Sequence, residues 1–145
     1  MRNEMHYELM ATQSVFKKRI LEEIAKTCPD LSPGQPKVLA FLMAEPDSIQ
    51  CEIAEGCFIE PPTLTNLLAK METAGLIERV RNDENRRTVT VSLSEKGFET
   101  AQKVKRAFAI VEARALKGVS REEEEFLVPL LKKLRGNLLK ESANA

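Results

Sequence analysis

The segment IEPPTLTNLLAKMETAGLIERVRNDENRR, residues 59–87, decides the fold, because it joins a helical pattern to an alternating one. Pro61 and Pro62 suit the first turn of a helix, where a missing N–H group does little harm. At about 100° per residue, one side of this helix is apolar, with Leu64, Leu67, Leu68 and Met71. The other side carries Pro62, Thr63, Asn66, Ala69, Lys70 and Thr73.

This second side is short-chained and polar, and its acidic neighbour Glu72 lies only on the flank. Such a face can lie in a DNA major groove, where the amide of Asn66 could pair with adenine and a threonine could meet a base edge. The alternative is an ordinary solvated helix face, which most surface helices have. The residues that flank the helix favour the first interpretation.

The segments LIERVR (76–81) and TVTVSL (88–93) alternate apolar and polar residues and are rich in β-branched types. They are typical of two strands, which the polar tip 82–87 would join into a hairpin. From Arg79 to Arg87 this region holds four arginines against two acidic residues. The tip could be a wing that reaches the DNA backbone or a minor groove, or simply a solvated polar turn.

A short helix is expected directly before the polar-faced one. Asp47 or Ser48 could cap it, Ile53 and Ala54 would face inward, and Gly56 would end it. Two helices joined by so tight a connection form a helix-turn-helix, whose second helix enters the groove.

Four further helices are expected: residues 4–27, a helix from Ser32 and Pro33 to near Pro46, one from Ser94 to Gly118, and one capped by Ser120 with Glu123. Pro129 should bend the last of them. Its apolar stripe is Leu127, Leu130, Leu131, Leu134 and Leu138, and that of the helix before it is Phe98, Ala101, Val104, Phe108, Val111 and Ala115. Terminal stripes with little to cover them indicate a partner subunit.

Composition sets limits on location and chemistry. No apolar run approaches the roughly 18 residues of a membrane span, and the N-terminus lacks a signal-peptide pattern. Three irregularly spaced cysteines make no disulfide framework, so we expect a cytoplasmic protein with reduced thiols. One histidine and no glycine-rich phosphate loop argue against an enzyme, a metal site or a cofactor. The balance of 22 basic and 22 acidic residues weighs against nucleic-acid binding, but DNA senses the local patch.

The chain resembles the MarR family of multiple-antibiotic-resistance regulators. The resemblance runs through LSPGQPKVLAFL, EIAEGCFIEPPTLTNLLAKMETAGLIER and DENRRTVTVSLSEKG, and the helix order extends it to nearly the whole chain. It implies a mainly α fold with a small β-hairpin wing: one domain, 1–145, with a winged helix-turn-helix at about 32–93 and dimerisation helices in 1–31 and 94–145. In the wing motif of this family, Arg87 matches the arginine, whereas position 85 holds Asn in place of Asp.

The resemblance further implies a homodimeric transcription factor that binds a pseudo-palindromic operator in double-stranded DNA, most simply a repressor. A small, often aromatic, anionic effector or an oxidant would relieve it. No residues are assigned to an effector site. Family positions and local charge together give these candidate DNA contacts: Pro62, Thr63, Thr65, Asn66, Lys70, Arg81, Arg86 and Arg87.

Two alternatives stay open. Some relatives sense peroxide through an N-terminal cysteine, and Cys28 is the nearest candidate, although free cysteines are usually inert packing residues. A winged helix can also serve as a protein-interaction module without an operator, which zero net charge would suit.

Overall fold

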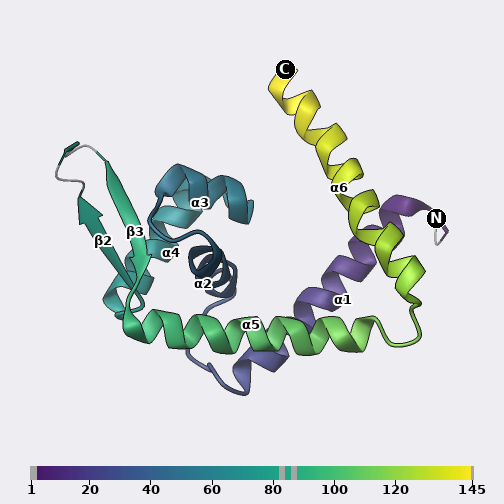
Figure 1. The fold of residues 1–145 in the computed structure, drawn as a ribbon, viewed down its shortest axis with the longest axis horizontal. Helices are drawn as coiled ribbons and strands as arrows, with labels where there is room; N and C mark the ends of the chain where they lie inside the picture. The colour runs from purple at the N-terminus through teal and green to yellow at the C-terminus, as the bar shows by residue number, and fades with distance from the viewer. Residues whose placement is uncertain (1–2, 82–83, 86–87, 145) are drawn as a thin grey trace. The chain divides into compact units, whose positions relative to one another are not determined.

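The computed structural model describes residues 3–81, 84–85 and 88–144. The helices and strands are α1 (Met5–Ala25), α2 (Gln35–Ala44), β1 (Ser48–Ile49), α3 (Gln50–Cys57), α4 (Pro61–Thr73), β2 (Ile77–Arg81), β3 (Val89–Leu93), α5 (Glu95–Ala115) and α6 (Arg121–Asn144) (Figure 1). The chain forms two compact units, Met1–Val111 and Glu112–Ala145. The expected mainly α fold with a small hairpin is confirmed.

The sheet contains a strand that the sequence pattern did not predict. β1 pairs with β3 in antiparallel register, Ser48 opposite Val91 and Ile49 opposite Thr90, which gives the strand order β1-β3-β2. A strand of two residues is too short to show alternation, and it continues directly into α3. The hairpin itself is as predicted, with β2 and β3 paired from Ile77–Leu93 to Arg81–Val89.

The start of α3 differs from the prediction that Asp47 or Ser48 caps it. Ile49 occupies the cap position, and its N–H donates to Glu52 Oε1 at 2.9 Å. Ser48 Oγ instead donates to the carbonyl of Glu45 at 2.7 Å, since Ser48 belongs to β1. Asp47 takes a positive φ of 58° in the turn before it.

The end of α3 also differs, because Gly56 lies inside the helix. The helix runs to Cys57, and Phe58 provides the left-handed residue at φ 54°. A Cβ built on Gly56 would overlap the Phe41 ring. Gly56 therefore permits α3 to approach α2 closely, a packing role that is easily mistaken for a helix stop in a sequence.

α2 begins later than the predicted start at Ser32 and Pro33. Its first residue is Gln35, and Gly34 takes the cap position. Gln35 provides the local stabilisation, because its Oε1 accepts the N–H of Ser32 at 3.2 Å. The hydroxyl of Ser32 is buried and has no hydrogen-bond partner, so it caps nothing.

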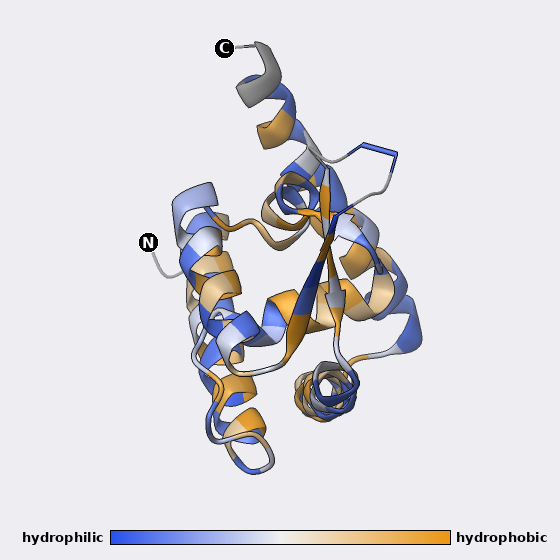
Figure 2. Cartoon of the chain, turned by 90° about the vertical axis from the view of Figure 1, so that its left-hand side faces the viewer, coloured by the Kyte–Doolittle hydropathy of each residue, from blue (hydrophilic) through white to orange (hydrophobic). Residues whose placement is uncertain are grey.

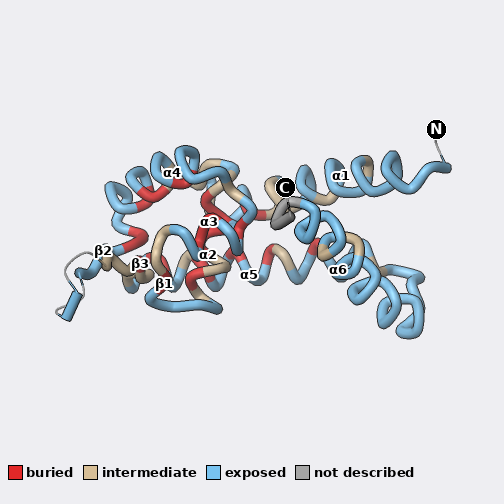
Figure 3. Tube along the Cα trace, turned by 90° about the horizontal axis from the view of Figure 1, so that it is seen from above, coloured by how far each residue is buried: buried red, intermediate tan, exposed pale blue. Residues whose placement is uncertain are grey.

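The core of the first unit is mainly aliphatic and draws on α2, α3, α4, the sheet, α5 and, through Ile24, the end of α1 (Figure 3). The inward side of α4 is as predicted for Leu64, Leu68 and Met71, each fully buried. Leu67 is half-buried and lies over Gly34, where a Cβ would stand 2.6 Å from its Cδ1. The other large side chains that are fully buried are Val38, Leu39, Leu42, Ile53, Val91 and Val104.

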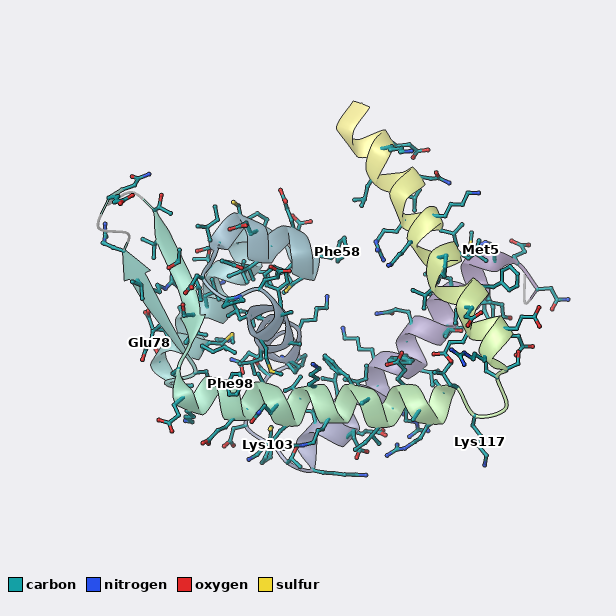
Figure 4. The ribbon with its side chains drawn as sticks, viewed as in Figure 1. Met5, Phe58, Glu78, Phe98, Lys103 and Lys117 are labelled. Carbon is teal, nitrogen blue, oxygen red and sulfur yellow. The ribbon has the colours of Figure 1, made fainter. Side chains whose placement is uncertain are left out.

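α5 is anchored to the turn between α4 and β2. Ser94, the predicted first residue of this helix, instead caps α5, which begins at Glu95. Its Oγ accepts the N–H of Gly97 at 3.0 Å, and its own N–H donates to the Leu76 carbonyl at 3.0 Å. A Cβ on Gly97 would overlap that carbonyl oxygen. The side of α5 that faces the core therefore contains Gly97, Ala101 and Val104. Phe98, which was predicted to belong to this apolar stripe, lies next to it and is 48% exposed. Figure 4 labels Phe98 near the start of α5.

The second unit consists mainly of α6. The predicted capping box is confirmed: Glu123 N–H donates to Ser120 Oγ at 3.0 Å, and Ser120 N–H donates to Glu123 Oε2 at 2.9 Å. The helix continues through Pro129. Its exposed large apolar side chains are Phe126, Leu127, Val128, Leu130, Leu131, Leu138 and Leu139.

The N-terminal helix has a similar surplus of apolar surface. In α1 the exposed large apolar side chains are Met5, Tyr7, Leu9, Met10 and Val15. Figure 2 colours the chain by hydropathy, with hydrophobic residues in orange and hydrophilic ones in blue. A single chain thus leaves apolar positions of both terminal helices in water, as the sequence predicted. No helix within the described residues combines the length and apolar composition of a membrane span.

We expect Gly97→Ala to destabilise the protein by more than about 2 kcal/mol, because a methyl group beside the Leu76 carbonyl would force backbone movement. The matched control is Gly136→Ala in α6, where no atom lies within 4 Å of the new Cβ and alanine favours the helix. Urea unfolding at one fixed protein concentration measures both. Equal midpoints for the two variants would contradict the close approach.

Candidate nucleic-acid interface

The outward face of α4 is the main surface to consider. Pro62, Thr63, Asn66 and Lys70 are exposed, as predicted, on the side of α4 away from its buried leucines, and Thr65 is exposed as well. Its first turn carries no acidic residue, and Lys70 lies in its last turn. The face therefore presents amide, hydroxyl and ammonium groups to solvent, which are the groups that contact base edges and phosphates.

The N-terminus of α4 offers one backbone donor. Pro61 and Pro62 occupy the first two positions and have no N–H, and the N–H of Leu64 donates to the Glu60 carbonyl at 3.0 Å. The amide of Thr63 is thus the first that this helix can present to a phosphate, in a position where N–H groups lack an intrahelical acceptor.

Contacts with α2 fix the position of α3, the first helix of the helix-turn-helix. Lys37 Nζ donates to the Cys57 carbonyl at 2.9 Å, which satisfies the end of α3, and Cys57 Sγ donates to the Lys37 carbonyl at 3.7 Å. The N–H of Ile59 donates to the Ala54 carbonyl at 3.0 Å and closes the turn into α4. These bonds, with the close approach of Gly56 to Phe41, hold α3 against α2 and join α3 to the turn that leads into α4.

A further polar residue, which sequence reasoning missed, joins the face from α3. Gln50 Nε2 donates to Thr65 Oγ1 at 2.7 Å, and Thr65 Oγ1 donates to the Pro61 carbonyl at 3.0 Å. Gln50 and Thr65 are far apart in the sequence, and no periodic pattern links them. Only the crossing of the two helices reveals the pair.

The hairpin brings Arg79, which was not among the predicted DNA contacts, close to the end of α4. Arg79 Nε lies 3.3 Å from Glu72 Oε2 at the end of α4, an exposed ion pair that contributes little stability. Arg81 is exposed at the end of β2. The N–H of Thr88 donates to the Asn85 carbonyl at 3.0 Å in the tip. Arg86 and Arg87, the other predicted wing contacts, lie outside the described residues.

A shallow cavity of about 320 Å³ lies where the hairpin meets the start of α3. Arg79, Gln50 and Cys51 contribute its polar groups, and the wall is completed by Ile49, Thr88, Val89 and Val91. It brings the Arg79 guanidinium group and the Cys51 thiol into one cavity beside Gln50. No side chain of this cavity was predicted as a ligand contact.

The three thiols occupy different environments. Cys51 is exposed, Cys28 is half-buried after α1, and Cys57 is buried. Burial raises the pKa of the Cys57 thiol, and the positive charge of Lys37 only partly offsets this. Thr27 Oγ1 donates to Cys28 Sγ at 3.7 Å. Among the described residues, no His, Cys, Asp or Glu side chains gather into a group that could hold a metal ion.

Comparison with known proteins agrees with this geometry. Residues 30–88 match the MarR family model. The structure is similar to the transcriptional repressor CouR bound to a 23-mer DNA duplex, with a TM-score of 0.80 and 28% identity over 91% of this chain and 92% of that chain. It is also similar to CouR bound to p-coumaroyl-CoA, with a TM-score of 0.76 and 27% sequence identity over 91% of both chains.

Similarity of fold is also found at lower sequence identity. The transcriptional regulator SlyA gives a TM-score of 0.86 at 22% identity, over 96% of both chains. The matched segment contains α2, α3, α4 and the hairpin as far as Thr88, and the structural likeness includes the flanking helices. The chain thus has the winged-helix fold of MarR-family regulators, and its residues 30–88 match the family model.

Proposed function

We propose that the protein is a homodimeric transcriptional repressor that binds a pseudo-palindromic operator through α4 and the wing. The observation that carries this proposal is the exposed face of α4, with Thr63, Asn66 and Lys70 and no acidic residue in its first turn. CouR, a repressor of similar structure that is bound to a DNA duplex, supports it.

Each element of the interface has a distinct role in this proposal. Asn66 reads a base, because its amide can donate to and accept from one adenine. The Thr63 amide and Lys70 hold phosphates, and Pro62 and Thr65 line the approach to the groove. Arg81, Arg86 and Arg87 hold the wing on the backbone or in the minor groove through their charge.

The dimer rests on the apolar surface of α1 and α6. Leu127, Leu130, Leu131 and Leu138 are exposed in the single chain, although such side chains gain about 1.5–3 kcal/mol each on full burial. In the proposed assembly a second copy covers them, and residues 1–145 act as one MarR-type domain: a winged helix-turn-helix at about 32–93 with dimerisation helices on either side. A two-fold dimer of this kind selects an inverted repeat.

A small molecule relieves repression in this proposal. The structure of CouR with p-coumaroyl-CoA supports relief by a ligand. For the present protein we propose a small and often aromatic anion. Relief by an oxidant through Cys28 is the second route, and the half-buried position of this thiol argues against fast oxidation. In either case the protein acts in the cytoplasm, without a catalytic step or cofactor.

The competing function is a protein-interaction module with no operator, which zero net charge favours. Selecting fragments from random DNA with the purified protein, and then measuring affinity against salt, separates the two. A dimer that binds DNA enriches an inverted repeat, and its affinity falls steeply with salt because phosphate contacts release counterions. An interaction module enriches no sequence and shows almost no salt dependence.

We expect Asn66→Ala to weaken binding to the selected site by about 1–3 kcal/mol and to flatten the preference at one base position per half-site. The control is Arg86→Ala, which removes charge from the wing. It should weaken binding to selected and random DNA alike. The slope of log affinity against log salt concentration should fall by about one for each phosphate that the wing no longer neutralises. If Asn66→Ala weakened all sequences equally, a reading role for Asn66 would be wrong.

The double variant Leu131→Glu, Leu134→Glu should be monomeric at micromolar concentration and bind the operator poorly, because an interface would bury unpaired charge. Sedimentation and operator titration measure the two effects. Lys132→Glu with Lys140→Glu, which changes charge on other sides of α6, should leave the dimer intact. A wild-type chain that sediments as a monomer would refute the assembly.

Thiol chemistry tests the oxidant route. At pH 8 we expect iodoacetamide to label Cys51 first and Cys57 last, because Cys57 is buried and its raised pKa leaves less reactive thiolate. Peptide mass spectrometry over a time course gives the order.

Replacing all three cysteines with serine should leave the DNA response to peroxide unchanged. Loss of a peroxide response in Cys28→Ser alone would make the protein a redox sensor.

A further inference from the structure

The hydrogen bond between Gln50 and Thr65 links the first residue of α3 to the exposed face of α4. Thr65 Oγ1 accepts from Gln50 Nε2 at 2.7 Å and donates its only hydrogen to the Pro61 carbonyl at 3.0 Å. Thr65 is exposed, whereas Gln50 is half-buried. The pair therefore lies at the border between the interior of the helix-turn-helix and the surface proposed to meet DNA.

This pair restricts what Thr65 can offer to a base. A threonine in a helix divides between two side-chain rotamers, since its hydroxyl can bond a carbonyl of the preceding turn. The bond from Gln50 favours the rotamer that keeps the hydroxyl on the Pro61 carbonyl. With its hydrogen engaged, Thr65 cannot donate to a base or a phosphate. Its methyl group and one oxygen lone pair remain, and a methyl group suits contact with thymine.

We propose that Gln50 is a specificity-positioning residue, which fixes the Thr65 side chain and thereby sets the base preference of α4 at one position in each half-site. This inference rests on the proposed DNA-binding function and adds a residue of α3 to the reading surface. Gln50 acts through Thr65, so its removal abolishes the base preference at that position and leaves non-specific phosphate contacts unchanged.

The same helix supplies an internal control. Thr73 Oγ1 donates to the Ala69 carbonyl at 3.0 Å, the same bond within the helix that Thr65 makes to Pro61. Thr73 is also exposed, about two turns further along α4. A Thr→Val change at either position removes one hydroxyl from an exposed helical site, so the two variants differ in the contact with Gln50.

The experiment compares Gln50→Met, which keeps length and removes the amide, with Thr65→Val and Thr73→Val. Binding to the selected site and to all single-base variants of it gives the preference at each position. We expect Gln50→Met to bind the selected site about two- to tenfold more weakly, as for the removal of one hydrogen bond, and to show no preference at one position per half-site. Its affinity for random DNA and its salt slope should match the wild type. Thr73→Val should keep the base preference that Gln50→Met loses, and its loss of that preference would contradict a specific role for Gln50.

Coupling between the residues is the sharper result. If Gln50 works through Thr65, Thr65→Val should weaken wild type but add little to Gln50→Met, so the two effects are not additive. In the DNA-free protein, scalar couplings of the Thr65 side chain should report one rotamer in wild type and averaging in Gln50→Met. This measurement needs no DNA and also shows, with the thermal transition, that the variant is folded.

The outcomes separate the inference from the function beneath it. A wild type that selects a sequence, together with a Gln50→Met protein that keeps every base preference, overturns the inference alone. Additive effects of the two changes, or rotamer averaging already present in wild type, overturn it as well. A wild type that selects no sequence and shows no salt dependence refutes the DNA-binding proposal and the inference with it.

Discussion

The burial of Leu64, Leu68 and Met71 fixes the rotation of α4 about its axis, and the outward face depends on it. Each of these side chains is fully buried and contributes about 1.5–3 kcal/mol through removal from water. A rotation by one residue would place Thr65, Ala69 and Glu72 at the core, with an unpaired charge inside. Asn66 and Lys70 therefore face solvent because the alternative orientation is too unfavourable, before any contact with DNA is considered.

The sequence predicted the elements in which several nearby residues follow a regular pattern. It did not predict features that depend on one contact between residues far apart in the chain. The faces of α4, the hairpin and the capping box of α6 each involve several residues in a regular pattern, and all three agree with the structure. β1 is too short for a pattern, and Gly56 serves its neighbour Phe41 across helices. Gln50 was missed for the same reason, since its partner lies on another helix.

Zero net charge and an interface for DNA are compatible because charge acts locally. The exposed face of α4 has no acidic residue in its first turn, while the first turn of α6 has three glutamates in the other unit. At physiological salt, exposed charges more than about 8 Å apart are largely screened. Acidic side chains that stand farther than this from α4 add little repulsion there. Zero net charge still gives less general attraction to DNA than a basic excess would, so a protein of this composition depends more on its few well-placed contacts than a basic protein does.

The start of α5 is tied to the end of α4 through polar contacts in one turn. Ser94 donates through N–H to the Leu76 carbonyl and through Oγ to the Gly75 carbonyl, and Lys96 Nζ donates to the Ala74 carbonyl at 2.8 Å. Gly97 lies so close to Leu76 that even a methyl group between them would clash. Packed contacts of this kind transmit a displacement because they cannot stretch or compress freely. In the proposed dimer, an effector that shifted α5 would therefore move α4 and the hairpin with it, and the spacing of the two reading helices would change without any change within the helix-turn-helix itself.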